Sequence, residues 1–461
     1  MHNKTWLIWR HSLQFLKAFQ SLRYDHVPIG MLLLRDFQKY ALRHTVSLRS
    51  AQAVKALPVR DLQAACKPYM LQAKPDLGKS GYTLIRAELF GVAKDSVEEK
   101  LLYVAHYPRE YKFMKKQKAC RPLINFQSLP PAKLSPALAG EVMRRLRQCL
   151  ASPSTPAVFR RRSFRIWMTA RVRHAILQVR RAHTLFERYP IKRTIYGSTM
   201  NHHGVLITSF AQSRNVHTVN VQHGLFGPLG HLPVNADMNF VWGKSHYDFL
   251  RSYGAPAEKI MVSGPCFYRN LPSRDSADAR PPGVRLQALV ALQPLGHSFN
   301  TRMIRLIEQA AKPFDRSVSV QYKLHPDQGG GSLYTKLLRC RRSRIIKHGT
   351  VPLNKLIMQA DVVLTPFSSV AYESLMSGKP VFFYKKPRFV YYIRSAPTCF
   401  RSAGELTRLL SRAIKEPWNL GEWHRRMGVK DKAAASGGDG ARFIWAALRR
   451  LSAGKVSDSA S

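Results

Sequence analysis

Acidic side chains are scarce in this chain of 461 residues. Aspartate and glutamate together number 27, against 74 lysines and arginines, so the formal net charge is +47. This excess excludes an electrically neutral surface and favours polyanionic partners, which are nucleic acid, anionic lipid headgroups or an acidic glycan. The charge concerns partners only, because net charge does not specify how a chain folds.

Long apolar runs and paired cysteines are also absent. The apolar stretch from Trp6 to Trp9 is interrupted by Arg10 and His11, which argues against a signal peptide. No run of about 18 uncharged apolar residues is available to span a bilayer. The six cysteines form no Cys-x-x-Cys pair, so a zinc site or a disulfide framework is not expected. These absences predict a cytoplasmic protein whose contact with a membrane, if it makes one, is peripheral.

Several catalytic signatures are missing as well. The chain has neither the glycine-rich phosphate loop of P-loop enzymes nor a Gly-x-Gly-x-x-Gly sequence, which argues against those two nucleotide-binding folds. It has no Asp-x-Asp, no His-Glu-x-x-His and no Gly-x-Ser-x-Gly, so the usual ligands of a catalytic metal and the usual serine nucleophile are lacking. We expect no metal and no cofactor.

Hydropathy patterning divides the chain into five parts. Residues 1–80 are predicted to form a basic helical extension without a chemical motif. Residues 81–269 and 285–430 alternate short apolar strands with helices, which is typical of α/β domains with parallel sheets. A polar, proline-rich linker is predicted at 270–284, and a flexible tail rich in Ala, Ser, Gly and Lys at 431–461. Two α/β domains that face each other across a cleft are therefore expected.

A basic helical segment is predicted at 142–189, inside the first of these domains. From Val142 to Phe186 it contains no acidic residue and many arginines, and its apolar residues recur at near-helical spacing. One interpretation is a helix docked on the protein with its arginines in solvent. The other is an interfacial helix drawn onto anionic lipid.

Two groups of polar residues follow strands of the second α/β domain. His325 comes directly after a predicted strand, where it can bind a phosphate and donate a proton to a leaving group. Pro326 keeps the backbone before it extended, and Lys323 adds a positive charge two residues earlier. Taken alone, this histidine is better explained by a purely structural role at a strand end.

Ser368 and Ser369 open a predicted helix after another strand. Ser368 is a natural N-cap, and the free N–H groups of a helix N-terminus attract anions. Glu373 lies one turn farther, where its carboxylate could hold ribose hydroxyls. Plain helix capping and a solvated glutamate are the simpler interpretations of these residues.

His223 stands at a strand end in the first α/β domain, within the sequence Gln222-His223-Gly224. The glycine permits a tight turn that exposes the histidine, which could act as a general base on an acceptor hydroxyl. A buried, hydrogen-bonded histidine is the structural alternative.

Together these residues resemble the motifs of GT-B glycosyltransferases, and more narrowly those of bacterial capsule and surface-polysaccharide transferases. The sequence Ala291-Leu292-Gln293-Pro294 resembles the Gln-Pro element of capsule Kdo transferases. Lys323-Leu324-His325-Pro326 resembles the His-Pro motif shared by bacterial sialyltransferases, Kdo transferases and teichoic-acid glycerophosphotransferases. Ser368-Ser369, with the segment from Ala371 to Val381, resembles their serine motif and the return to the next strand. The resemblance covers about residues 190–390.

The resemblance implies a GT-B-like fold of two Rossmann-like domains and metal-independent chemistry. The second domain would bind the donor nucleotide through Gln293, Pro294, Lys323, His325, Pro326, Ser368, Ser369 and Glu373. In the families that use CMP-sugars, the His-Pro histidine stabilises or protonates the departing phosphate, which His325 would do here. The first domain would bind the acceptor, and His223 matches the position of a candidate base in the glycerophosphotransferases.

The chain departs from the resemblance in its acidic residues. Sialyltransferases carry a paired acidic motif in the first domain, and this sequence shows no clear acidic pair before a glycine. Either His223 replaces that motif or the donor is not a sialic acid. Gly296-His297 also lacks the acid that the capsule Kdo families carry after their Gln-Pro element.

The sequence thus predicts an inverting glycosyltransferase for a bacterial surface polysaccharide or lipopolysaccharide. The expected partners are a nucleotide sugar, with CMP-linked Kdo or sialic acid as candidates, an anionic glycan or glycolipid acceptor, and the anionic inner face of the cytoplasmic membrane. The alternatives are transfer of glycerol phosphate from CDP-glycerol, a non-catalytic relative, and a basic nucleic-acid-binding protein. The last would use Phe159, Phe164 and Trp167 among the arginines, although no known nucleic-acid-binding module is present.

Overall fold

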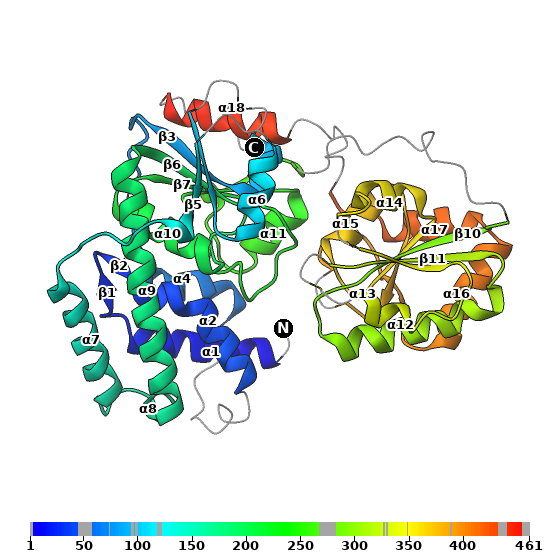
Figure 1. The fold of residues 1–461 in the computed structure, drawn as a ribbon, viewed down its shortest axis with the longest axis horizontal. Helices are drawn as coiled ribbons and strands as arrows, with labels where there is room; N and C mark the ends of the chain where they lie inside the picture. The colour runs from blue at the N-terminus through cyan, green and yellow to red at the C-terminus, as the bar shows by residue number, and fades with distance from the viewer. Residues whose placement is uncertain are drawn as a thin grey trace. The chain divides into compact units, whose positions relative to one another are not determined.

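The computed structural model divides into two compact units (Figure 1). The first unit comprises Met1–Phe267 with Asp439–Ser461, and the second comprises Tyr268–Gly438. The described residues are 3–44, 58–72, 74–93, 96, 100–117, 122–266, 283–325, 328, 331–347, 349–387, 390–431 and 440–453. Most of the predicted linker, residues 270–282, lies outside the described residues.

The described residues of the first unit form a parallel sheet of seven strands. Their order across the sheet is β5-β4-β3-β6-β7-β8-β9. The strands are β3 (Tyr82–Arg86), β4 (Leu101–Ala105), β5 (Leu123–Asn125), β6 (Ile191–Tyr196), β7 (His217–Val221), β8 (Met238–Val241) and β9 (Ile260–Val262). The order reverses between β3 and β6, and ligands of such sheets bind at the carboxyl ends of the strands beside this point.

The predicted N-terminal extension is helical, but it belongs to the packing of the first unit. The helices concerned are α1 (Asn3–Ala18), α2 (Ile29–Arg43) and α4 (Leu62–Cys66), with the short strands β1 (Arg23–Tyr24) and β2 (Val27–Pro28) between the first two. Phe15 and Phe37 stack at 4.4 Å between ring centroids, and both meet Phe159. These large apolar side chains are fully buried, so α1 and α2 form part of the unit's core.

The remaining helices of the first unit lie partly on its sheet and partly at the end away from the sheet (Figure 1). They are α5 (Phe90–Ala93), α6 (Pro108–Lys116), α7 (Pro136–Ala151), α8 (Ala157–Arg160), α9 (Arg162–Arg188), α10 (His202–Ser213), α11 (Lys244–Arg251) and α18 (Gly440–Ser452). Helix α9 contains most of the predicted basic segment. Its apolar residues Phe164, Met168, Val172 and Val179 are buried, and α2, α7 and α10 pack against it. The interpretation as a docked helix is confirmed, and the interpretation in which this apolar face enters lipid is wrong.

The C-terminal residues correct another prediction. A flexible tail was expected at 431–461, but residues 440–452 form α18, which lies across the first unit (Figure 1). Ile444, Trp445 and Leu448 are buried in a core cluster with residues of β3, β4 and β7. The Trp445 indole N–H donates a hydrogen bond of 2.9 Å to the Val92 carbonyl. The chain therefore returns from the second unit to complete the core of the first.

Replacing Trp445 with alanine is expected to destabilise the first unit by about 3–5 kcal/mol, because it leaves a large cavity and removes a buried hydrogen bond. The matched control is Phe443 on the same helix, which is 42% exposed. Its replacement with alanine is expected to cost about 0.5 kcal/mol or less. Urea denaturation of both variants measures the difference. Equal losses would contradict the assignment of α18 to the core.

The second unit is a smaller α/β unit with the same topology. Its parallel strands are β10 (Leu286–Ala291), β11 (Val318–Lys323), β12 (Ser343–Ile346), β13 (Val362–Thr365), β14 (Val381–Tyr384) and β15 (Thr398–Phe400), in the order β12-β11-β10-β13-β14-β15. Its helices are α12 (His297–Ala311), α13 (Gly331–Thr335), α14 (Leu353–Gln359), α15 (Ser369–Met376), α16 (Ala403–Lys415) and α17 (Trp418–Met427). The order reverses between β10 and β13. The two α/β domains predicted from the sequence are thus both Rossmann-like.

No helix in the described part of the chain is both long enough and apolar enough to cross a bilayer.

Candidate active site

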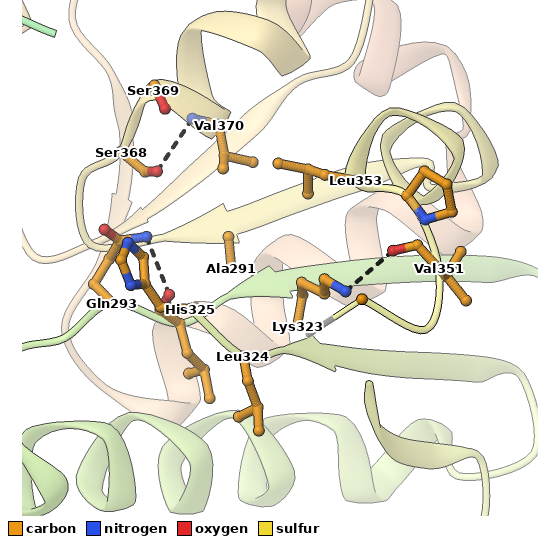
Figure 2. Close-up of a pocket in the computed structure, with 13 residues that line it drawn as sticks. Ala291, Gln293, Lys323, Leu324, His325, Val351, Leu353, Ser368, Ser369 and Val370 are labelled. Carbon is orange, nitrogen blue, oxygen red and sulfur yellow. Dashed lines mark hydrogen bonds between the residues drawn. The ribbon is translucent and has the colours of Figure 1, made fainter. Parts of the chain in front are cut away.

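A cavity of about 480 Å³ lies at the carboxyl ends of β10, β11 and β13 in the second unit (Figure 2). Five of the residues singled out from the sequence line it together: Gln293, Lys323, His325, Ser368 and Ser369. The other residues that line it are Ala291, Leu292, Leu324, Gly349, Val351, Pro352, Leu353 and Val370. The reversal of strand order between β10 and β13 opens a crevice here, because the helices that follow these two strands lie on opposite faces of the sheet.

The N-terminus of α15 faces this cavity. The Ser368 hydroxyl oxygen caps the helix by accepting the Val370 N–H at 3.1 Å. The first turn contains no acidic residue, so no carboxylate of that turn competes for the remaining N–H groups. Ser369 and Val370 line the cavity from this turn. The arrangement suits a phosphate, because helix N–H groups, the helix dipole and two serine hydroxyls lie at one place.

Lys323 contributes a buried positive charge to the opposite wall. It is 9% exposed, and its Nζ donates hydrogen bonds to the carbonyls of Lys347 at 2.9 Å and Val351 at 3.1 Å. Burial lowers the pKa of this ammonium group. Two of its three hydrogens thus hold the backbone before α14 in place, and the third remains for a ligand of the cavity. Lys323 therefore shapes the cavity as well as charging it.

Two loops at the cavity are tied together by side-chain amides. The Gln328 side chain accepts the backbone N–H of His325 at 3.0 Å and donates to the Gln293 carbonyl at 3.1 Å. The buried Asn300 also donates to the Gln293 carbonyl, at 2.9 Å. The backbones that carry Gln293 and His325 are therefore fixed relative to each other before any ligand binds.

Three of the predicted nucleotide-binding residues are not placed at the cavity. Pro294 is exposed and does not line it. Glu373 is half-buried, one turn beyond Ser369 along α15, and does not line it either. Pro326 lies outside the described residues. A ligand would need to extend beyond the cavity to meet Glu373.

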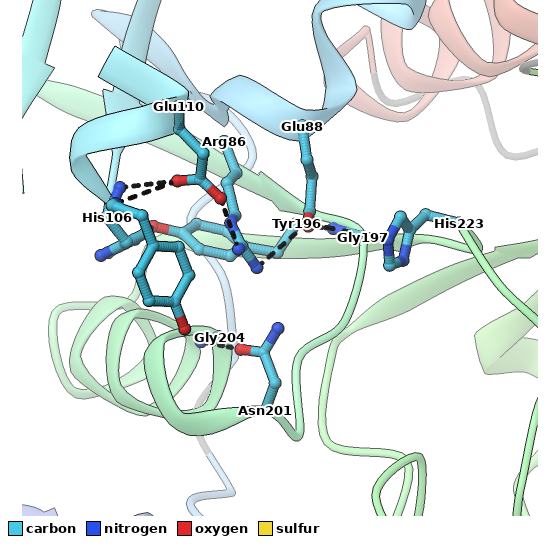
Figure 3. Close-up of polar contacts among 10 residues, drawn as sticks. Arg86, Glu88, His106, Glu110, Tyr196, Gly197, Asn201, Gly204 and His223 are labelled. Atoms are coloured by element: carbon cyan, nitrogen blue, oxygen red, sulfur yellow. Dashed lines mark hydrogen bonds and ion pairs between the residues drawn. The ribbon is translucent and has the colours of Figure 1, made fainter. Parts of the chain in front are cut away.

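A polar cluster occupies the corresponding position in the first unit, at the carboxyl ends of β3, β4, β6 and β7 (Figure 3). Its centre is Arg86, whose side chain is 6% exposed and lies between Glu88 at 3.1 Å and Glu110 at 2.8 Å. Burial opposes the charge of Arg86, but the two carboxylates outweigh it and raise the pKa of the guanidinium. The cluster therefore holds one permanent cation between two carboxylates.

His223 lies beside this cluster. Its Nε2 is 3.8 Å from a carboxylate oxygen of Glu88, and the other oxygen of Glu88 accepts the Gly197 N–H at 3.2 Å. A Cβ on residue 197 would stand 2.6 Å from that oxygen and 3.0 Å from the Cβ of His223, so glycine is required for this close approach. The His223 side chain is 46% exposed and that of Glu88 only 15%. The structure thus presents an accessible imidazole backed by a fixed carboxylate.

The aromatic groups behind the cluster are uncharged. The His106 ring is buried, contacts the Tyr196 hydroxyl at 2.9 Å and stacks on His203 at 4.3 Å between centroids. Burial, together with His203 and Arg86, holds the pKa of His106 well below its usual value. Burial and the neighbouring His202 lower the pKa of His203 to about 3. Both rings are therefore neutral near pH 7 and support the charged groups from behind.

Arg86, Glu88 and Glu110 were not among the candidate site residues predicted from the sequence. Glu88 and Glu110 belong to different elements and meet only at Arg86, so they are not the paired acidic motif before a glycine that the sequence lacks. The available signal was Arg86-Ala87-Glu88, which begins at the last residue of β3. The hydropathy pattern did not reveal this short strand, because Thr83 and Arg86 leave few apolar residues in it. Among the described residues, no group of three or more His, Cys, Asp or Glu is arranged to hold a metal ion.

Comparison with known proteins gives a match in structure alone. No family model matches the chain, and no curated protein matches its sequence. A solved UDP-N-acetylglucosamine 2-epimerase has a TM-score of 0.52 at 12% identity, covering 83% of this chain and 100% of its own. A Listeria monocytogenes protein named as a UDP-N-acetylglucosamine 2-epimerase has a TM-score of 0.51 at 11% identity, with coverages of 83% and 100%. The MnaA–UDP structure from S. aureus has a TM-score of 0.50 at 12% identity, with coverages of 82% and 99%. At these identities the likeness shows the fold, which is GT-B-like.

Proposed function

We propose that this chain is a metal-independent glycosyltransferase that moves a sugar from a nucleotide-activated donor to a bacterial surface polysaccharide or a lipid-linked acceptor. One observation carries the proposal: residues from three separate strand ends, predicted from the sequence to bind the donor nucleotide, line one cavity. Gln293, His325 and Ser368 lie 32 or more residues apart in sequence and meet only through the fold. A structural role for each alone would not require this convergence.

The donor nucleotide is assigned to the cavity of the second unit. Its phosphate is placed at the N-terminus of α15, where Ser368 and Ser369 supply hydroxyls and His325 and Lys323 supply positive or proton-donating groups. The sequence resemblance favours a CMP-linked donor. The names of the structural neighbours, which include UDP and UDP-N-acetylglucosamine, add a UDP-linked donor as a candidate.

The acceptor is assigned to the first unit, with His223 as the general base. As the acceptor hydroxyl attacks the anomeric carbon of the donor sugar, its proton passes to the imidazole of His223. Glu88, 3.8 Å away, stabilises the imidazolium that forms and orients the ring. Arg86 and the Gly197 N–H hold Glu88 in position. The attack from the face opposite the nucleotide inverts the configuration at that carbon.

The leaving group is assigned to His325 and α15. The bond between the anomeric carbon and the phosphate oxygen breaks, and its electron pair stays with the phosphate. His325 donates a proton or a hydrogen bond to that oxygen, while the N–H groups of α15 stabilise the negative charge. His223 with Glu88 thus accepts the proton released by the acceptor, and His325 with α15 stabilises the negative charge on the departing phosphate.

Transfer of glycerol phosphate from CDP-glycerol is the second candidate function. The position of His223 after Gln222 at the end of β7 favours it, because the resembling glycerophosphotransferases place a candidate base there. The same cavity and the same serine and histidine groups would then hold the cytidine nucleotide.

The test of the proposed function is a product analysis in EDTA. Purified protein is incubated with CMP-Kdo, CMP-sialic acid, UDP-N-acetylglucosamine or CDP-glycerol and an extract of lipid-linked bacterial glycans. We expect a new glycosidic bond with inverted anomeric configuration, formed at the same rate with and without Mg²⁺. A phosphodiester product would establish the second candidate. Conversion of UDP-N-acetylglucosamine to its 2-epimer without acceptor, or dependence on a metal, would contradict the proposal.

A further inference from the structure

Four arginines are exposed at the junction of α8 and α9 in the first unit: Arg160, Arg161, Arg162 and Arg165. None of their side chains makes an ion pair or a hydrogen bond with another described residue. Ile166, beside them, is 63% exposed. We call these five residues the arginine cluster. Figure 1 shows α8 and the start of α9 at the end of the first unit that lies away from its sheet.

No acidic residue near the arginine cluster in sequence neutralises it. Between Glu141 and Glu187 the chain contains no aspartate or glutamate. Glu141 is already bound to Arg144, at 2.8 Å, and to Arg145, at 2.5 Å. Unlike these two arginines, the four arginines of the cluster have no acidic partner among the described residues, so an external anion can pair with them. A polyanion is the kind of partner that such a surface attracts.

The positions of the aromatic side chains in this segment distinguish a nucleic-acid partner from a lipid surface. Binding to single-stranded nucleic acid uses exposed aromatic side chains on which bases stack. Phe159 and Phe164 are fully buried here, and the half-buried Trp167 packs on Tyr40 at 4.8 Å between ring centroids and on Phe164 at 5.4 Å. The aromatic residues that suggested nucleic-acid binding from the sequence are therefore occupied inside the protein.

The apolar member of the arginine cluster fits a lipid surface. Ile166 is exposed near the start of α9, next to Arg165 and four residues after Arg162, although most apolar residues of this helix point into the core. An exposed aliphatic side chain among basic groups suits the boundary between headgroups and acyl chains, where the charges bind phosphates and the side chain enters the apolar layer.

We propose that the arginine cluster is a docking surface for an anionic membrane, and that it binds lipid phosphate headgroups. The contact differs from the interfacial helix that was one interpretation of the sequence, because the N-terminal end of α9 makes the contact and the apolar face of the helix is buried in the protein. The surface goes beyond the transfer reaction and does not depend on which donor the enzyme uses. It would keep the enzyme next to lipid-linked glycans.

The test is cosedimentation of the full-length protein with vesicles. Vesicles of phosphatidylcholine with about 30% phosphatidylglycerol, whose anionic surface attracts basic segments, are compared with vesicles of pure phosphatidylcholine. The test variant replaces Arg160, Arg162 and Arg165 with glutamine. The control variant removes three exposed charges from the second unit, by replacing Arg302, Arg305 and Arg408 with glutamine.

Each basic residue at an anionic surface strengthens binding several-fold, so the test variant should bind anionic vesicles on the order of 100-fold more weakly than the wild type. The affinity of the control variant for anionic vesicles should stay within about 3-fold of the wild-type affinity, since salt screens the long-range effect of charges far from the membrane contact. Replacing Ile166 with serine should weaken binding to a smaller extent without changing the net charge. All variants should keep the circular dichroism spectrum of the wild type, because the replaced side chains are exposed.

Two results would overturn the proposal. Equal losses in the test and control variants would mean that the binding follows total charge and has no local surface. Tighter binding of the wild type to an RNA hairpin than to anionic vesicles at the same salt concentration, lost in the test variant, would assign the cluster to nucleic acid. Vesicle binding lost in the test variant alone supports the membrane surface.

Discussion

Replacing His325 with alanine is expected to reduce sugar transfer by about 10²–10⁴-fold, the usual range for loss of a general acid. The side chain lines the cavity beside the N-terminus of α15. Its contacts with Gln328 that hold the loop use the backbone: the N–H at 3.0 Å and the carbonyl at 2.9 Å. Alanine preserves these backbone groups, so the second unit should keep its fold. Steady-state kinetics with saturating donor should show the loss mainly in kcat.

His297 provides the matched control for this experiment. It is an exposed histidine of the same unit, at the start of α12, and it does not line the cavity. Alanine at His297 should leave kcat within about 3-fold of the wild type, as for most surface substitutions. A His325→Ala variant that transfers sugar at the wild-type rate would remove His325 from the mechanism. Equal losses in the two variants would point to general damage of the unit.

In the first unit, replacing His223 with alanine should lower kcat by about 10²–10⁴-fold, and Glu88→Gln by roughly 10–100-fold. His223 is proposed to receive the acceptor proton, and Glu88 to stabilise the resulting charge from 3.8 Å. Glutamine keeps an oxygen for the Gly197 N–H but loses the negative charge. The donor KM should change little in both variants, because the donor is assigned to the other unit.

Glu110 separates this positioning role from a merely structural one. Like Glu88, it forms a close ion pair with the buried Arg86, so Glu110→Gln should cost similar stability. Figure 3 shows Glu110 on the side of Arg86 away from His223, and its carboxylate accepts hydrogen bonds from Arg86 and from the backbone N–H groups of His106 and Tyr107. Its glutamine variant should therefore keep kcat within about 3-fold. Glu88→Asp should recover part of the rate lost in Glu88→Gln. Equal kcat losses for Glu88→Gln and Glu110→Gln would contradict the role of Glu88.

The second unit was predictable from sequence because its local signals agree. Strands β10, β13 and β14 are short, largely apolar and buried. Polar residues follow the central strands within a few positions, as His325 follows the end of β11 at Lys323. A parallel sheet brings such strand ends to one edge, so five of the eight predicted nucleotide-binding residues meet at one cavity. The exact lining was less predictable. Pro294 and Glu373 are near the cavity in sequence but do not line it, because turn geometry and helix rise set their directions.

The first unit was less predictable because its signals are long-range. Glu88 and Glu110 are ordinary acidic residues in sequence, and only the pairing of β3 with β4 and β6 brings them to Arg86 and His223. Helix α18 was missed because the polar composition around it hides the short apolar pattern of Ile444, Trp445 and Leu448. The partners of that pattern are strands β3, β4 and β7, which lie far away in the chain, and no local pattern reveals such a contact.

The most direct test of the central claim is calorimetric nucleotide binding in EDTA. CMP, CDP, UDP and GDP are titrated into the wild type, into Ser369→Ala, which removes a cavity hydroxyl without removing the Ser368 cap, and into Glu88→Gln. We expect one nucleotide to bind the wild type at a single site. Its affinity should be at least 10-fold lower in Ser369→Ala, because one charge-assisted hydrogen bond contributes about 1.5–3 kcal/mol. Its affinity for Glu88→Gln should equal that for the wild type. Selective binding of CMP would indicate a Kdo- or sialic-acid-type donor. Binding of CDP would indicate transfer of glycerol phosphate, and binding of UDP or GDP would indicate a hexose donor. Absence of binding, or binding that only Glu88→Gln disrupts, would contradict the assignment of the donor to the second unit.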